Sequence, residues 1–523
     1  MRPLLMGVET EYAVTGFHVD GAAPAETLLD YFLQTARRRL PHVPEERSSI
    51  GVFLGNGGRF YIDAGSHPEF ATPECTEPRE LLTYVRAGER ILLELAREVA
   101  RNISYIDEIG VFRCNVDYSA KTTWGCHESY LHRTDPQVLP KLLIPHLVSR
   151  VIYSGAGGFN VRSAGVEFTL SPRVSMLEHT ISETSTAARG IFHTKDETLG
   201  TAGQHRLHVL CGESLCSDLG VLLKIGTTAL IVAAIDEGMF TAEGLELQAP
   251  LEAMRAIATD PFLRTCVRLR RGEPVTAIEL QRRCLAQVES CRAAGRLPHW
   301  ADEICVLWTD ALDQLERNPA WAAGRLDWGI KRALCERWVG GSDLWRALDI
   351  STSRWKRVRR LLDSALSRSA EPPPRSLAEL MLCLHSPLPG PAARIGRYLH
   401  DKRKEWAWLR NFLELREQLF EIDVRFGQLG ERGIYEHLAR DQRRFARLAT
   451  DEAIERATRE PPAIGRAHLR GKLVQQLHAA GTAATHWCGW TGVWNLNSGA
   501  SVDMRDPFTT EVKWRKASAV ITE

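Results

Sequence analysis

Residues 59–75, RFYIDAGSHPEFATPEC, constrain the fold more than any other part of the chain. Strand-forming residues flank the glycine-rich turn 55–58, which predicts two antiparallel strands joined by a short hairpin. Because side chains alternate along a strand, Arg59, Tyr61 and Asp63 should share one face, with apolar residues on the other. Such a polar face requires water, a metal ion or a substrate against it. These residues alone leave a solvated edge strand and a functional surface equally open.

A second polar strand is predicted near the N-terminus, over residues 4–15. Glu9 and Glu11 are two residues apart and should point to one face, with Val8 and Tyr12 on the other. Two neighbouring carboxylates destabilise a strand unless cations neutralise them. Mg²⁺ takes hard oxygen ligands and bridges to phosphates, so the pair indicates a magnesium site. An exposed strand edge is the alternative.

Composition excludes several classes of protein. The chain has 523 residues, enough for two or three domains, and a net charge of +1, which favours neither nucleic acid nor a membrane as a partner. Its 12 cysteines form no zinc-binding pattern and indicate free thiols in a reducing cytoplasm. The acidic N-terminus is not expected to be a signal peptide, and the longest apolar run, 229–235, is too short to span a bilayer.

The sequence predicts an α+β fold with three parts. Residues 1–237 read as an antiparallel sheet domain with a few helices, among them a long helix at 78–102 and a buried helix at 222–235. A strand is predicted at 175–184, and a polar loop at 191–203.

From residue 238 the pattern becomes helical, and this second part extends to residue 460. One of its predicted helices covers 321–338. A basic stretch lies within it at about 340–405, and residues 341–410 contain 14 Lys and Arg against 7 Asp and Glu. We interpret this stretch as a basic amphipathic helix on a solvated face rather than a helix-turn-helix.

The third part, residues 461–523, is predicted to be a small C-terminal domain. Arg466 and Arg470 lie four residues apart on a predicted helix, where they can bind a carboxylate or a phosphate. Trp487, Trp490 and Trp494 follow, and they either stack on a purine or complete a core.

Seven motifs, in this order, resemble the Pup ligase and Pup deamidase/depupylase family. That family belongs to the carboxylate–amine ligase superfamily and has a glutamine-synthetase-like sheet, so the resemblance implies the same fold here. It covers roughly residues 1–335 and 408–510. The motifs are GVETEY at 7–12, the 59–75 segment, WGCHESYL at 124–131, HTKDE at 193–197 with RLHV at 206–209, LLKIGTTAL at 222–230, RAHLRGKL at 466–473 and RDPF at 505–508.

The resemblance implies an ATP- and Mg²⁺-dependent enzyme that acts on a small ubiquitin-like protein tag. In the ligase, ATP phosphorylates the side-chain carboxylate of the tag's C-terminal glutamate. A lysine of a target protein then attacks the acyl phosphate, which gives an isopeptide bond. In the related deamidase/depupylase, the same site deamidates a C-terminal glutamine or cleaves that bond.

The family's residue roles transfer to matching positions of this sequence. Asp63 is implied to be the base that takes a proton from the incoming lysine. The residues implied to hold Mg²⁺ are Glu9, Tyr61 and Glu69, with Glu11, His127 and His208 near the metal or the phosphate. The residues implied to contact ATP are Arg59, Thr72, Arg206 and Trp490, with Trp487 or Trp494 as substitutes for Trp490.

Two features favour the ligase over the depupylase. The Gly125-Cys126-His127 motif has the ligase's cysteine, and the short connection at 15–55 lacks a long inserted loop. The chain departs from the family at Ser129, where the motif has Asn, and in the HTKDETLG loop. Another carboxylate–amine ligase and a non-catalytic binding relative therefore remain alternatives.

Overall fold

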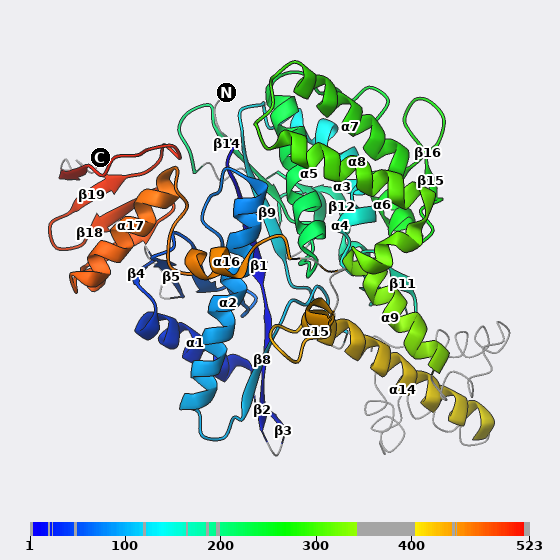
Figure 1. The fold of residues 1–523 in the computed structure, drawn as a ribbon, viewed down its shortest axis with the longest axis horizontal. Helices are drawn as coiled ribbons and strands as arrows, with labels where there is room; N and C mark the ends of the chain where they lie inside the picture. Colours follow the sequence, from blue (N-terminus) through cyan, green and yellow to red (C-terminus); the bar gives the residue numbers. More distant parts are fainter. Residues whose placement is uncertain are drawn as a thin grey trace.

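The computed structural model describes most of the chain, and the basic stretch at 340–405 lies almost entirely outside the described residues. An antiparallel sheet stands at the centre, with a group of helices on one side and a smaller sheet at the C-terminus on the other (Figure 1). The described residues are 4–18, 21–23, 25–45, 50–118, 122–163, 166–184, 188–194, 199–341, 403–441, 445 and 447–516.

The central sheet has seven strands in the order β14-β9-β1-β7-β6-β5-β4, and all neighbouring strands are antiparallel. The predicted hairpin at 55–58 joins β5 to β6. The strands are β1 (Met6–Glu11), β4 (His42–Pro44), β5 (Gly51–Leu54), β6 (Arg59–Ile62), β7 (Pro68–Ala71), β9 (Cys126–His132) and β14 (His205–Val209).

Strand register gathers the polar residues on one face of the sheet. Glu9 of β1 lies opposite His127 of β9, and Glu11 lies opposite Glu69 of β7. On the next strand, Tyr61 is also opposite Glu69. Directly opposed residues on adjacent strands point to the same side, so this register assembles a continuous polar surface.

The other face of the sheet is apolar and covered by helices α1 (Ala25–Arg39), α2 (Pro78–Asn102) and α5 (Asp218–Asp236). Val8 and Tyr12 are buried on this side, as alternation predicted. Helix α5 has the length and apolarity to cross a membrane. However, 89% of its most apolar window is buried inside the protein, as in the core helix of a folded domain.

Three elements predicted within residues 1–237 differ in the structure. The strand predicted at 4–15 divides into β1 and β2 (Ala13–His18), and β2 joins β3 (Gly21–Ala23) and β8 (Glu108–Phe112) in a separate sheet. Within 175–184 only β12 (His179–Ser182) is a strand, because the preceding segment forms the 3₁₀ helix η1 (Pro172–Met176). The loop predicted at 191–203 begins as strand β13 (Gly190–His193), which pairs in parallel with β12.

The helical part packs beside the sheet and continues into the long helix α14. The helix predicted at 321–338 begins only at Asp327, because the 3₁₀ helix η2 (Pro319–Gly324) ends at Arg325, whose φ of −142° is not helical. The helices are α3 (Leu139–Ser149), α4 (Val151–Ser154), α6 (Pro250–Ala258), α7 (Ala277–Ala293), α8 (Ala301–Arg317), α9 (Asp327–Gly341), α14 (Arg403–Phe426), α15 (Ile434–Asp441) and α16 (Asp451–Ala457). Two short hairpins complete this part, β10 (Gly158–Phe159) with β11 (Phe168–Thr169) and β15 (Cys266–Val267) with β16 (Val275–Thr276).

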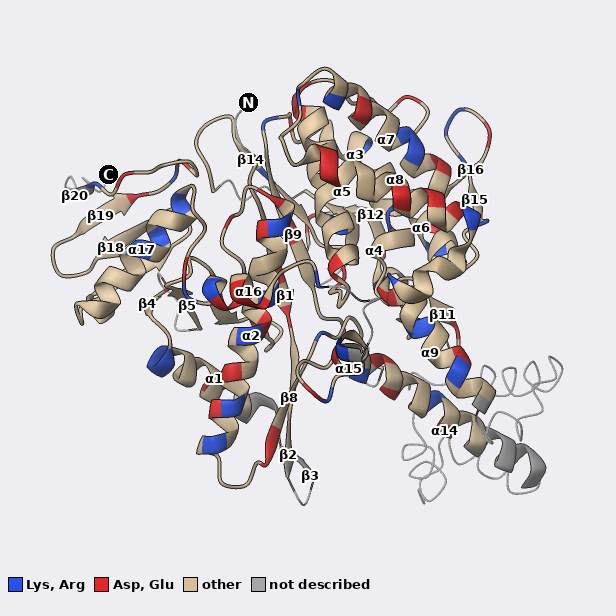
Figure 2. Cartoon of the chain, in the orientation of Figure 1, with Lys and Arg blue, Asp and Glu red and all other residues tan. Residues whose placement is uncertain are grey.

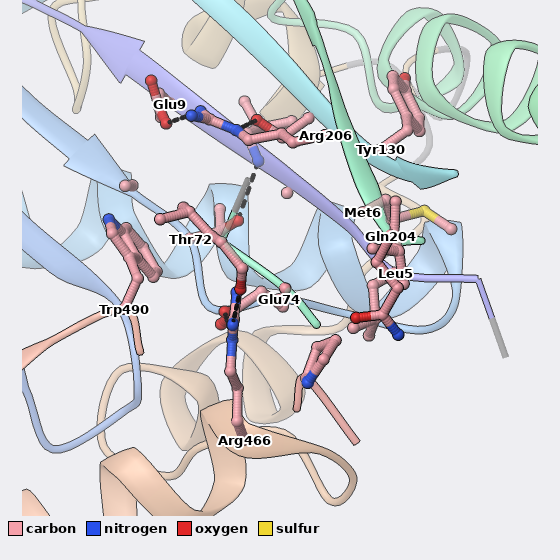
Figure 3. Close-up of a pocket in the computed structure, with 18 of the residues that line it drawn as sticks. Leu5, Met6, Glu9, Thr72, Glu74, Tyr130, Gln204, Arg206, Arg466 and Trp490 are labelled. Atoms are coloured by element: carbon pink, nitrogen blue, oxygen red, sulfur yellow. Dashed lines mark hydrogen bonds and ion pairs between the residues drawn. The ribbon is translucent and has the colours of Figure 1, made fainter. Parts of the chain in front are cut away.

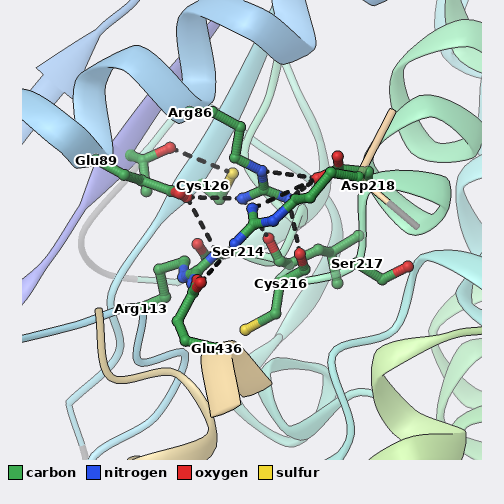
Figure 4. Close-up of polar contacts among 12 residues, drawn as sticks. Arg86, Glu89, Arg113, Cys126, Ser214, Cys216, Ser217, Asp218 and Glu436 are labelled. Atoms are coloured by element: carbon green, nitrogen blue, oxygen red, sulfur yellow. Dashed lines mark hydrogen bonds and ion pairs between the residues drawn. The ribbon is translucent and has the colours of Figure 1, made fainter. Parts of the chain in front are cut away.

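Buried ion pairs connect the sheet to the helical part (Figure 4). Arg86 of α2 pairs with Asp218 at the start of α5 at 2.8 Å, and with Glu89 of its own helix. Arg113 joins Glu89 to Glu436 of α15, the latter at 3.0 Å. Elsewhere, charges of both signs alternate over the helices (Figure 2), in keeping with the nearly neutral chain.

The C-terminal part forms a four-stranded antiparallel sheet that packs with helix α17 against β4 and β5. Val43 and Phe53 of the central sheet share an apolar core with Val474 and Val493 of this part. It therefore attaches to the edge of the central sheet. Its elements are α17 (Arg466–Ala479), the 3₁₀ helix η4 (Ala483–Thr485), β17 (His486–Gly489), β18 (Gly492–Asn495), β19 (Ala500–Asp503) and β20 (Trp514–Lys516).

Candidate active site

Two neighbouring cavities open along the polar face of the central sheet, and Glu9 lines both of them. We call the first the apolar pocket (Figure 3) and the second the acidic cavity. The apolar pocket is formed by Leu5, Met6, Gly7, Val8, Glu9, Ala71, Thr72, Glu74, Ser129, Tyr130, Leu131, Leu199, Gly200, Gln204, His205, Arg206, Arg466, Trp490 and Pro507.

The apolar pocket distinguishes the three C-terminal tryptophans. Only Trp490 of the three lines it, whereas Trp487 is 36% exposed and Trp494 lies further along β18. The Trp490 ring packs edge-on against Phe53, with ring centroids 5.1 Å apart, and the Arg470 guanidinium lies 4.8 Å from it. This packing holds Trp490 at the pocket wall.

Arg466 and Arg470 both bind Glu74, which follows β7. Arg466 Nε donates to Glu74 Oε1 at 2.7 Å, and Arg470 pairs with Glu74 Oε2. Burial works against ionisation of Glu74, but the charges of the two arginines outweigh it and lower its pKa to about 2. The anion that these arginines bind is therefore a carboxylate of this chain, and it fixes α17 beside the apolar pocket.

Arg206 and Glu9 form a charged pair where the two cavities join. Arg206 Nη2 lies 2.8 Å from Glu9 Oε1, and Arg206 Nε donates to Ser129 Oγ at 3.0 Å. Burial works against ionisation of Glu9, but its hydrogen bond with His127 and the charge of Arg206 hold the pKa of Glu9 well below its usual value. Glu9 is therefore ionised at neutral pH.

Thr72 and Arg59, which the sequence also assigned to ATP, lie in different surroundings. Thr72 lines the apolar pocket, and its Oγ1 accepts a hydrogen bond from Val8 N at 3.1 Å. Arg59 lines neither cavity. Its guanidinium lies 3.6 Å from the Tyr61 ring centroid and pairs with Glu45 at 2.6 Å.

The acidic cavity contains most of the residues that the sequence assigned to catalysis and metal binding. Carboxylates and histidines from β1, β7, β9, β13 and β14 meet here, together with two arginines, Arg173 and Arg189, which sequence reasoning missed. The lining residues are Glu9, Glu11, Tyr61, Asp63, Ala64, Gly65, His67, Glu69, Thr122, Thr123, Gly125, His127, Arg173, Arg189, His193 and His208.

The donor atoms in this cavity fit a divalent cation. Glu9, His127 and His208 each offer one ligand atom within 4.8 Å of the others, as do Glu11, Glu69 and His127. His208 Nε2 is buried and makes no hydrogen bond within the described residues. Burial and the charge of Arg206 lower the pKa of His208 well below its usual value, so its ring is neutral and offers a lone pair.

Glu69 also indicates that positive charge belongs in this cavity. Burial, and then the charges of Glu9 and Glu11, raise its pKa well above the usual value for a carboxyl group. Burial and the charge of Glu69 likewise raise the pKa of Tyr61, which keeps it a neutral phenol. A bound cation would relieve the repulsion among these carboxylates.

His67 connects Asp63 to Glu11. His67 N donates to Asp63 Oδ1 at 2.6 Å, while His67 Nδ1 lies 3.4 Å from Asp63 Oδ2 and 3.3 Å from Glu11 Oε2. Burial lowers the pKa of His67, but the two carboxylates outweigh it and raise the pKa to about 9. His67 belongs to the 59–75 segment but was assigned no role from the sequence. Its position four residues after Asp63 could have indicated a contact between the two side chains.

The chain matches the family model described as Pup-ligase protein over residues 4–358 and 401–493. The Pup–protein ligase of Acidimicrobium ferrooxidans is 31% identical over 97% of this chain and 96% of its own length. That of Gordonia bronchialis is 31% identical over 97% of both chains, and that of Nocardia farcinica is 35% identical over 66% of this chain and 76% of its own.

Solved structures of the ligase PafA have the same fold. In the complex of PafA with Pup, the matched chain aligns with 97% of this chain over 90% of its own length, with a TM-score of 0.72 and 23% identity. The complex of PafA with ADP covers 93% and 91%, with a TM-score of 0.67 and 24% identity. The family model and the full-length relatives together assign the sequence, and the chain belongs to the Pup-ligase protein family.

Proposed function

We propose that this protein is an ATP-dependent Pup–protein ligase. It phosphorylates the side-chain carboxylate of the C-terminal glutamate of a Pup tag and joins that glutamate to a lysine of a target protein. The observation that carries the proposal is the position of Glu9, which lines both the apolar pocket and the acidic cavity. Phosphoryl transfer needs a nucleotide site and an acceptor site that meet, and the two cavities meet at Glu9.

The apolar pocket is the proposed nucleotide site. Trp490 offers apolar surface for the base, and Arg206 stands at the side nearest the acidic cavity, where it can contact the phosphates. Thr72 lies on the same wall. Arg59 stays a predicted ATP contact that would act from outside the pocket, through its position over the Tyr61 ring.

Glu9, Glu11, Glu69, His127 and His208 would hold Mg²⁺ in the acidic cavity, with the Tyr61 hydroxyl beside them. The metal ion supplies positive charge that neutralises the phosphate oxygens during transfer. The protein residues contribute fixed ligand atoms and a water-poor setting. Arg206 adds a permanent charge at the boundary between the two cavities.

Asp63 is the proposed base for the second step. The ammonium group of lysine has a reference pKa near 10.4, and it must lose a proton before the nitrogen can attack. A positioned carboxylate accelerates such a step by about 10²- to 10⁴-fold. His67 holds the Asp63 carboxylate through its backbone N–H and its ring.

The direction of the reaction is proposed as ligation, because the matched relatives are named Pup–protein ligase. We propose three structural parts: 1–237 as the catalytic sheet domain, 238–460 as its helical part, and 461–523 as a small domain that completes the nucleotide site. All eleven cysteines in the described residues are free, which supports a cytoplasmic location.

The test uses the purified chain with Mg·ATP, a Pup protein ending in Glu and a lysine-bearing target. We expect ADP formation together with a tag–target conjugate whose mass shows one isopeptide bond. Incubation of a tag–target conjugate with the protein, with no further target added, distinguishes the depupylase alternative, which would release the tag from the conjugate. If neither conjugation nor release takes place, the proposed function is wrong.

A further inference from the structure

One wall of the acidic cavity is formed outside the seven-stranded sheet and carries positive charge. Arg173 comes from the 3₁₀ helix η1, and Arg189 directly precedes strand β13. Both guanidinium-bearing residues line the cavity whose sheet face carries Glu9, Glu11 and Glu69. The cavity is therefore acidic on the sheet and basic on the wall beyond it.

The backbone of both arginines is fixed by the fold. Arg173 is 5% exposed, its N–H donates to Glu213 Oε1 at 2.9 Å, and its Nη1 donates to the Gly212 carbonyl at 2.5 Å. The carbonyl of Arg189 accepts hydrogen bonds from Glu178 N at 2.8 Å and from His179 N at 3.1 Å. Hydrogen bonds thereby fix the Arg173 side chain and the Arg189 backbone, and both residues keep their places in the cavity wall.

The Arg189 side chain makes no hydrogen bond or ion pair within the described residues, although it is half-buried. Burial, and then the charge of Arg173, lower the pKa of Arg189 below its usual value. The carboxylates of Glu11 and Glu178 act in the opposite direction without forming an ion pair with Arg189, so an anion that pairs directly with its guanidinium would stabilise it further. The wall therefore favours an anionic ligand.

The substrate in the proposed function carries two carboxylates on its last residue. Its side-chain carboxylate has to approach Glu9, where the two cavities join. Its main-chain α-carboxylate has to lie elsewhere, and Glu9, Glu11 and Glu69 would repel it on the sheet face. Arg173 and Arg189 are the two arginines of the lining, and both lie outside the central sheet.

We propose that Arg189, supported by Arg173, binds the terminal α-carboxylate of the tag. This inference rests on the proposed function and adds a selection rule to it: the enzyme recognises a free chain end as well as a glutamate side chain. A glutamate inside a polypeptide has a neutral peptide group at that place. It would offer no carboxylate to the Arg189 guanidinium, so it would be rejected.

The experiment compares two tag peptides that differ only at the last main-chain group, a free α-carboxylate or an α-carboxamide. Because the carboxamide cannot form charge-assisted hydrogen bonds with a guanidinium, kcat/KM should be about 10- to 100-fold lower for the carboxamide peptide than for the free-acid peptide. In the Arg189→Gln variant, kcat/KM should fall by a similar factor with the free-acid peptide and change little with the carboxamide peptide. The ratio of the two kcat/KM values should therefore approach one. Arg189→Lys should keep part of the discrimination.

Arg432→Gln is the matched control. Arg432 is an exposed arginine that pairs with Glu108 at 2.7 Å and does not line the cavity. The control should leave the ratio unchanged. If Arg189→Gln lowers kcat/KM equally for both peptides, the ratio between them is unchanged. Arg189 then contacts the transferred phosphate or acts structurally, and the inference is wrong.

Binding of the two peptides, followed by fluorescence anisotropy without ATP, separates this inference from the proposed function. Preferential binding of the free-acid peptide that Arg189→Gln removes supports the inference even where no conjugate forms. Equal binding of both peptides by the unmodified protein overturns it, even where conjugation proceeds. Absence of conjugation by the unmodified protein with the free-acid tag counts against the proposed function.

Discussion

Glu74 and Arg466 are 392 residues apart in the sequence, and a charged hydrogen bond of 2.7 Å joins them at the edge of the apolar pocket. Arg470 binds the other oxygen of the same carboxylate. Glu74 thereby connects the end of β7 to helix α17. The proposed nucleotide site depends on this connection, because Glu74 and Arg466 both line it.

Replacing Glu74 with Gln should destabilise the protein and weaken nucleotide binding together. Removing one partner of a buried ion pair typically costs about 3–5 kcal/mol, because the remaining charges lose compensation. We expect a lower midpoint in thermal unfolding and a higher Kd for ATP by calorimetry. Glu303→Gln, which breaks an exposed pair with Arg79, is the control and should change stability by less than about 1 kcal/mol.

The stabilising effect of Glu74 should also depend on pH in a defined direction. Its folded pKa, about 2, lies below the ordinary value of 4.5. The carboxylate therefore contributes its full stabilisation above pH 4.5, and the contribution is lost as the pH falls towards 2. The stability difference between the unmodified protein and Glu74→Gln should shrink over this range in urea titrations. A constant difference would contradict the role of the Glu74 charge.

Trp490→Ala should weaken ATP binding much more than Trp487→Ala. Base–aromatic stacking is worth about 1–3 kcal/mol by alanine substitution, and only Trp490 of the two lines the pocket. Trp487 is 36% exposed and provides a matched control of the same residue type. Equal effects of both substitutions on the ATP Kd would mean that Trp490 does not contact the base.

Asp63→Asn should block transfer of the tag to lysine while leaving ATP binding almost unchanged. The amide keeps the size of the side chain but accepts a proton poorly, so conjugation should slow by about 10²- to 10⁴-fold. Conjugation is followed by gel shift and ATP binding by calorimetry. Conjugation at the unmodified rate would exclude Asp63 as the base.

Glu69→Gln should raise stability in the absence of metal and weaken Mg·ATP binding. The Glu69 carboxyl is buried beside Glu9 and Glu11, and its raised pKa reports unfavourable ionisation. Removing its charge relieves that repulsion, so unfolding in EDTA should shift to higher temperature. The same variant should require more Mg²⁺ for ATP binding, and a lower stability in EDTA would contradict this account.

Local patterns predicted the polar face of the sheet well. Strand alternation alone placed Glu9 with Glu11 and Tyr61 with Asp63, because a period of two follows from backbone geometry. The choice of partner across the sheet could not be predicted. Register sets the pairing of Glu9 with His127, and register depends on the packing of the whole domain.

Residues outside regular strands were the ones that sequence reasoning missed. Arg173 lies in a 3₁₀ helix and Arg189 directly precedes β13, and neither position falls within an element that the sequence predicted. Glu45, the partner of Arg59, directly follows the short strand β4 and forms a bridge with Cys488. Their roles arise from contacts between distant segments, which leave no periodic pattern in the sequence.

The closure of the apolar pocket by Trp490 and Pro507 has a consequence during protein synthesis. The strands that contribute Glu9 and Arg206 emerge from the ribosome long before this wall. Arg466 N donates to the carbonyl of Pro507 at 3.0 Å, so the pocket wall forms only after that residue has been translated. A nascent chain that has not reached Pro507 would therefore have an incomplete nucleotide pocket, and ATP consumption would begin only after Pro507 has been translated.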